Sequence, residues 1–155
     1  MITLRRAAVL GATSALAIAV AASPASAGTG LSVNDTVTLE GNSATVSGTY
    51  SCQTKDTKLA GVDKARVTLQ VLVTQGTLGT PDYVPGSDVI EVSCPATNKP
   101  WQMTLAPNAA HLGEKWKTGS GKVEATLLKS RPSNSLFGPS VVGQIAELNR
   151  TVSVD

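Results

Sequence analysis

Histidine and cysteine are scarce in this chain, and their scarcity excludes two classes of function. There is one His and there are two Cys among 155 residues, and the two Cys do not form a Cys-x-x-Cys pair. A structural metal site draws on several Cys or His ligands, and a dithiol redox motif needs two closely spaced cysteines. The sequence therefore predicts no metal site, no redox role and no cofactor.

The single histidine also limits catalysis. A Ser-His-Asp site has only His111 available, and no Gly-x-Ser-x-Gly elbow accompanies it. Asp82, Asp88 and Glu91 are close in sequence, but they lack the spacing of a calcium loop, and surface positions explain them better than a pair of catalytic carboxylates. We expect a protein that is not an enzyme.

Excess positive charge is missing as well. The chain has 13 Lys and Arg against 11 Asp and Glu, but Arg5 and Arg6 belong to a leader segment, so the remainder is formally neutral. The nearest group of lysines, within 115–122, is flanked by Glu114 and Glu124. A nucleic-acid partner requires clustered basic residues, so none is expected.

Only one long apolar run is present, and it lies at the N-terminus. Arg5 and Arg6 precede an Ala-, Leu- and Val-rich segment over 7–22, and Ala25-Ser26-Ala27 follows as a cleavage site. This order is typical of a secretory signal peptide over residues 1–27, whereas a membrane anchor needs ~20 apolar residues. Both the general and the twin-arginine export routes remain open. We expect a secreted, extracellular domain over 28–155, with no stable membrane insertion after cleavage.

What the mature chain does contain is a period-two alternation typical of half-buried strands. In Ala44–Cys52 the even positions are apolar or small, and the odd positions are hydroxyl residues. Similar patterns predict strands at 36–39, 44–52, 65–75, 88–94, 101–105, 122–129 and 144–154. About seven short strands separated by turn residues favour an all-β fold, namely a single antiparallel β-sandwich of immunoglobulin-like architecture.

The two cysteines are predicted to form one disulfide. Cys52 and Cys94 both share the inward phase of their strands, and an isolated pair in an exported protein is usually oxidised. Antibody domains join their second and sixth strands, with a Trp between the cysteines. Here the cysteines lie on the predicted second and fourth strands, and both tryptophans follow Cys94. The topology is therefore expected to differ, unless the number of strands does.

Five aromatic residues are divided between the core and the loops. Tyr50 and Trp101 share the phase of inward residues and are expected in the core. Tyr83, Trp116 and Phe137 lie in or beside Gly- and Pro-rich loops, where aromatic side chains can contact a ligand or partner. Each of the three could instead cover the edge of the core beneath its own loop.

Several of these features together resemble a known family. Gly48-Thr49-Tyr50-Ser51-Cys52, a Val-rich strand closing on Gln75-Gly76, Val92-Ser93-Cys94 and the following Trp101 are similar to a family of small secreted actinobacterial proteins of unknown function. The resemblance covers most of residues 28–155. It implies secretion and fold, and it carries no catalytic or binding residues to this sequence.

The functional expectation is correspondingly broad. We expect a secreted non-enzymatic module that binds an unknown protein, glycan or small molecule, or acts at the cell surface. A small-molecule carrier resembling the enediyne apoproteins is also possible, although those typically have two disulfides and this chain can form only one. A small hydrolase or a protease inhibitor fits the sequence less well.

Overall fold

The structure, a computed structural model, describes residues 28–59, 65–111, 113–131 and 141–155. The predicted signal peptide, residues 1–27, and Phe137 lie outside these ranges. The described chain forms strands and two single-turn 3-10 helices: β1 (Gly30–Val33), β2 (Thr36–Glu40), β3 (Ser43–Cys52), η1 (Thr54–Thr57), β4 (Arg66–Gln75), β5 (Val84–Val92), β6 (Ala96–Leu105), η2 (Ala109–His111), β7 (Gly119–Ser130) and β8 (Val141–Val154). The all-β prediction is confirmed. None of the helices in the described ranges has the length and apolar character of a membrane span.

The strands form one connected, open sheet with the order β1-β3-β2-β8-β7-β4-β5, and β6 pairs with the other side of β3. Most neighbours are antiparallel, but β2 and β8 run parallel where Thr36 and Val37 pair with Ser153 and Val154. The prediction of a purely antiparallel arrangement is therefore wrong. Parallel neighbours need a long connection, and most of the chain lies between β2 and β8.

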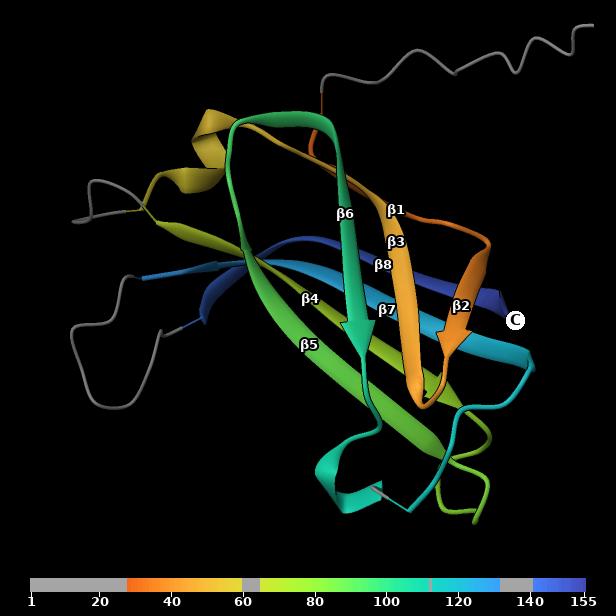
Figure 1. The fold of residues 1–155 in the computed structure, drawn as a ribbon. Helices are drawn as coiled ribbons and strands as arrows, with labels where there is room; N and C mark the ends of the chain where they lie inside the picture. Colours follow the sequence, from red (N-terminus) through yellow and green to blue (C-terminus); the bar gives the residue numbers. More distant parts are fainter. Residues whose placement is uncertain (1–27, 60–64, 112, 132–140) are drawn as a thin grey trace, which may run out of the picture.

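The sheet folds back on itself around one core. In Figure 1, β3 and β6 cross in front of β4 and β7. The buried side chains between the two halves form a single cluster, to which β3 contributes Val46, β4 contributes Leu69 and β7 contributes Leu127, each with 0% exposure. Tyr50 and Trp101 belong to this cluster, so their predicted core positions are confirmed.

The predicted alternation of β3 is confirmed from Ala44 to Tyr50, whereas Ser51, predicted to face outward, is buried. Its inward side chains are buried, while its outward hydroxyls bond to neighbouring strands: Ser32 Oγ lies 2.7 Å from Thr49 Oγ1, and Thr45 Oγ1 lies 3.1 Å from Thr104 Oγ1. Strand β4 alternates in the same way and lies between β5 and β7. These cross-strand hydroxyl pairs satisfy polar groups on a wet face without any further ligand.

Eight strands are described where about seven were predicted. The additional strand is β1, which pairs with the C-terminal half of β3. The last four predicted strands all begin too late. Strand β7 begins at Gly119 rather than Lys122, and β8 at Val141 rather than Gln144. The two largest errors are at β5, which begins at Val84 rather than Asp88, and at β6, which begins at Ala96 rather than Trp101. Both missed segments contain Pro, which an edge strand tolerates because one side of its backbone needs no partner.

The disulfide prediction is confirmed. Cys52 and Cys94 are bonded with an S–S distance of 2.04 Å and a Cα–Cα distance of 5.6 Å. Cys52 ends β3, and Cys94 lies just beyond β5. The bond therefore fastens the two halves of the folded sheet at one end of the core, and it places the chain between β5 and β6 against η1.

Candidate functional site

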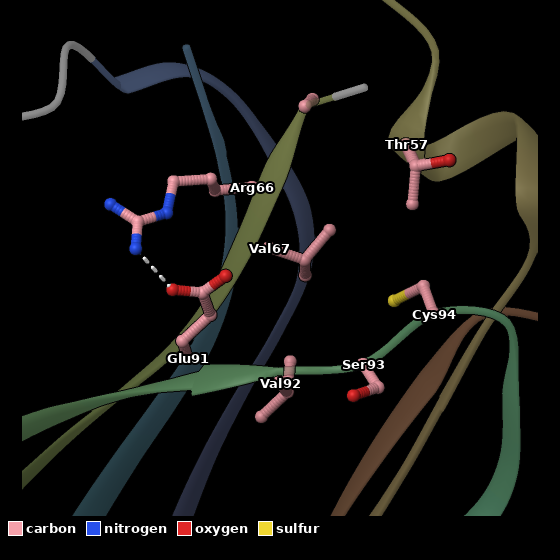
Figure 2. Close-up of a pocket in the computed structure, with 8 residues that line it drawn as sticks. Thr57, Arg66, Val67, Glu91, Val92, Ser93 and Cys94 are labelled. Atoms are coloured by element: carbon pink, nitrogen blue, oxygen red, sulfur yellow. Dashed lines mark hydrogen bonds and ion pairs between the residues drawn. The ribbon is translucent and has the colours of Figure 1, made fainter. Parts of the chain in front are cut away.

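A pocket of 360 Å³ lies beside the disulfide. Among the hollows of the described chain we take it as the candidate site, because it combines a buried apolar floor with charged groups. Figure 2 shows Thr57 on η1, Arg66 and Val67 on β4, and the segment from Glu91 to Cys94 around one hollow. These residues come from three separate elements. The register of β4 with β5 brings two of the walls together, since Val67 pairs with Val92.

The mouth of the pocket carries an ion pair. Arg66 Nη2 lies 2.6 Å from Glu91 Oε2, and both side chains are about half exposed at 49% and 54%. The two residues are diagonal neighbours across β4 and β5, because Thr68 is the direct partner of Glu91. An exposed pair of this kind contributes little stability, so its importance is that it presents opposite charges at the entrance.

The floor of the pocket is apolar and rigid. Val67 is 2% exposed and Ala65 is 3% exposed, so both are part of the packed interior. The Cys94 sulfur is held in place by the disulfide. An apolar floor with a few convergent polar groups is the usual composition of a site for a small organic ligand. Thr57 and Ser93 supply hydroxyl groups at the rim.

A second hollow, which we call the notch, lies on the other side of the end of β5. It has a volume of 180 Å³, and its lining residues come from β3, β5 and β6: Tyr50, Ile90, Glu91, Val92, Ser93, Lys99, Pro100 and Trp101. The Tyr50 hydroxyl donates to the Ser93 carbonyl at 3.2 Å across the core. The pocket and the notch share the segment from Glu91 to Ser93, which runs over the end of β5 at Val92.

Other hollows are present, but they do not combine a buried apolar floor with charged groups. One of them, of 380 Å³, lies on the far side of the disulfide and is lined by Gly28, by the segment from Cys52 to Lys55 and by Pro95–Thr97. Its lining is mainly chain between strands. Volume alone therefore does not single out a site, and the pocket beside Arg66 is preferred because it combines a buried apolar floor with charged groups.

The predicted contact residues Tyr83 and Trp116 lie at the opposite end of the molecule. Trp116 is 5% exposed, and its ring is close to Gly86, where a Cβ atom would lie 2.7 Å from the indole. Gln75 fixes the segment that follows Trp116, because Gln75 Oε1 accepts a hydrogen bond from the Lys117 N–H at 2.8 Å. Trp116 thus covers the edge of the core. Phe137 lies outside the described residues.

Tyr83 is partly buried beside the single histidine. Its ring meets the His111 ring edge-on, with centroids 5.9 Å apart and an interplanar angle of 79°. In the preceding turn the Thr80 hydroxyl donates to the Asp82 carboxylate, and this hydrogen bond lowers the pKa of Asp82. Tyr83 and Trp116 therefore lie at the end of the core near η2, away from the pocket.

His111 has a local partner in the described chain. Its Nδ1 lies 3.1 Å from Glu114 Oε2, three residues further along. No described hydroxyl group shares a hydrogen bond with the ring. The described residues also contain no group of three or more His, Cys, Asp or Glu that could hold a metal ion.

The residues of the pocket were not predicted as a site. Arg66 was not singled out in the sequence and Glu91 was interpreted as a surface acid, and both side chains face outward. What the sequence did not reveal is that they meet beside Thr57. The only signal was the predicted disulfide, because it had to bring the end of β5 close to the end of β3. Comparison of the chain with protein-family models, with curated proteins and with solved structures finds no match.

Proposed function

We propose that residues 28–155 form a secreted, non-enzymatic binding module, and that its ligand contacts the end of β5. The observation that carries this proposal is the 360 Å³ pocket, which joins a buried apolar floor to the Arg66–Glu91 pair. A surface hollow that is rigid, apolar at its base and charged at its mouth is suited to recognising a ligand with an apolar body and a polar group.

The proposal extends to the fold and the location. We assign the folded sheet to the immunoglobulin-like sandwiches, and the chain to the small secreted actinobacterial family that its sequence resembles. Export is supported by the leader pattern over residues 1–27 and by the oxidised Cys52–Cys94 pair, because disulfides persist outside the reducing cytoplasm. N-terminal sequencing of the exported protein should give Gly28 as its first residue.

A small-molecule carrier is the second candidate. The pocket volume of 360 Å³ exceeds the ~300 Å³ at which sites for drug-sized ligands begin. A carrier predicts that one small compound fills the pocket without contacting the notch. A module for a larger partner predicts contacts on both sides of the shared segment Glu91–Ser93.

Chemical-shift mapping with a library of small organic fragments tests the proposed site on the isotopically labelled mature chain. We expect the amide signals that move most to be those of Val67, Val92 and Ser93. Ser93→Trp should block these shifts by filling the pocket from its exposed rim. Gln70→Trp, on the outer face of β4, serves as the matched control and should leave them intact.

Two results would contradict the proposal. In the first, no fragment shifts the signals around the pocket, or Ser93→Trp leaves the shifts unchanged. In the second, the mature chain has hydrolase activity in a broad substrate screen and loses it in His111→Ala. The second result would establish an enzyme centred on the η2 end of the core.

A further inference from the structure

The free edge of β5 is covered along only part of its length. Strand β5 pairs with β4 on one side, and no described strand lies on the other. Near its start, the Pro85 carbonyl accepts from the Asn108 N–H at 2.8 Å, and the Ser87 N–H donates to Asn108 Oδ1 at 3.1 Å. The backbone groups of the odd-numbered residues therefore point away from β4, and Asn108 caps the first of them.

The next outward donor is also capped. The Val89 N–H donates to Asp88 Oδ1 at 2.7 Å. Continuing the period of two, the Val89 carbonyl and both backbone groups of Glu91 point the same way, and no described residue bonds to them. Covering edges in this manner limits unwanted strand pairing. The edge is thus open over a short stretch, from the Val89 carbonyl to Glu91.

The notch lies directly beside this open stretch. Tyr50 and Trp101 line it and are 3% and 6% exposed, so it has a rigid aromatic wall in addition to Ile90 and Val92. Its 180 Å³ is below the ~300 Å³ of a site for a whole drug-sized ligand. A single apolar side chain is the better match for a hollow of this size.

Two charged side chains, Glu91 and Lys99, line the notch, and among the described residues only Glu91 has a partner. The Glu91 carboxylate is engaged by Arg66 at 2.6 Å. The Lys99 ammonium forms no ion pair or hydrogen bond with any described residue. Lys99 pairs with Tyr50 across β6 and β3, so its side chain leaves the strand on the same face as the notch. A partner gains most here by presenting a negative charge.

We propose that the open edge and the notch together bind an extended acidic peptide segment by strand addition to β5. The segment bonds to the backbone of Val89 and Glu91, inserts one apolar side chain into the notch and places an acidic side chain beside Lys99. The apolar and acidic residues are two positions apart, because alternate residues share one face of a strand. This inference rests on the proposed function and names its class of partner.

A second copy of this chain fits the same edge less well. Pairing two β5 strands across the open stretch brings Glu91 of one copy close to Glu91 of the other, and like charges in that position are unfavourable. The Val89 N–H is already held by Asp88, so the two copies have fewer backbone bonds to exchange. An acidic peptide avoids the first problem at Lys99 and brings its own free donors.

Two synthetic peptides test the inference, acetyl-Thr-Leu-Thr-Asp-Thr-amide and acetyl-Thr-Asp-Thr-Leu-Thr-amide, which present the same pair of side chains for parallel and antiparallel addition. Binding to the mature chain is measured by calorimetry. It is also measured by the fluorescence of Trp101 in Trp116→Phe, since the chain has only two tryptophans. We expect one peptide to bind saturably with a Kd below about 1 mM.

The variants are chosen to separate binding from folding. Lys99→Glu should weaken binding by on the order of tenfold, and Lys115→Glu, an exposed lysine at the far end, should not change it. A peptide methylated on its central backbone nitrogens should lose binding, because it can no longer donate to β5. Sedimentation of the mature chain alone should show a monomer.

If neither peptide binds, or if Lys99→Glu and Lys115→Glu bind equally, the inference is wrong. A dimer that Lys99→Glu or a bulky Ile90→Trp disrupts would mean that a second copy is the occupant, and this too would overturn it. If the peptides fail while small fragments still shift the Val67 and Val92 signals, the peptide inference fails and the proposed function stands.

Discussion

At the scale of single residues, Gly48 controls how closely β1 can approach β3. A Cβ atom at this position would lie 2.0 Å from the Ser32 carbonyl oxygen and 2.9 Å from the Trp101 ring. The obstructing atom nearest to it is backbone, so it cannot rotate away. Gly48 is therefore required by a close approach and not by an unusual backbone angle.

Gly48→Ala is expected to destabilise the protein by about 1–3 kcal/mol, the usual cost of overpacking a core. Gly30→Ala is the matched control, because nothing lies within 4 Å of a Cβ atom there. Urea unfolding of both variants measures the difference. Equal midpoints for the two would show that β1 does not pack on Gly48 as described.

Arg150 is the other residue whose role depends on distant contacts. It pairs with Val123 and so leaves β8 on the inward face, where its guanidinium donates to the Val33 carbonyl at 2.8 Å and pairs with Asp35. In the sequence it interrupts an otherwise apolar alternation over 146–154. It ties the connection between β1 and β2 to β8.

Arg150→Ala should lower the free energy of unfolding by about 1 kcal/mol, because the side chain is partly exposed and its contacts are screened. Lys122→Ala removes an exposed pair with Glu124 and should cost less than about 0.5 kcal/mol. Parallel urea titrations compare the two. A loss at Arg150 no larger than that at Lys122 would mean that the link to β1 and β2 contributes no stability.

At the scale of elements, the disulfide joins β3 to the end of β5 and so supports both walls of the candidate site. The cysteines are 42 residues apart. For a loop of that length the chain-entropy estimate is about 4 kcal/mol, a large share of the ~5–15 kcal/mol that stabilises a typical domain.

Replacing both cysteines by Ala is therefore expected to lower the free energy of unfolding by about 4 kcal/mol. The wall of the pocket should also become less ordered, because the segment at positions 93 and 94 is no longer bonded to β3. Urea unfolding gives the energy, and amide chemical shifts near Val67 and Ser93 report the pocket. The reduced wild-type protein is the control and should behave like the double variant. An unchanged unfolding midpoint in both would contradict this role.

Which elements were predictable from the sequence depends on how local their causes are. The alternation of apolar and polar side chains in β3 and β4 can be read from each strand's own sequence, so both strands were predicted. The start of β5 was missed because Pro85 and Gly86 resemble a loop. In the structure β5 is an edge strand, which tolerates Pro85, and Gly86 leaves room for Trp116, where a Cβ atom would lie 2.7 Å from the ring.

At the scale of the whole molecule, the pairings between distant segments were out of reach. The parallel contact of β2 with β8 joins residues more than a hundred positions apart, and no periodicity signals it. The candidate site depends on the same kind of information, because Thr57, Arg66 and Glu91 meet only once the register of β4 with β5 is fixed. The disulfide was the one long-range contact that residue type and phase revealed.

The binding surface proposed for the whole molecule lies at the open end of β5, and amide hydrogen exchange at Glu91 tests this most directly. The mature chain is compared with and without the acidic peptide that binds best. The Glu91 amide should exchange at least about tenfold more slowly in the complex, while the Val89 amide, already held by Asp88, should change little. Saturable binding with an unchanged Glu91 amide, or protection confined to the η2 end of the core, would contradict a binding surface at β5.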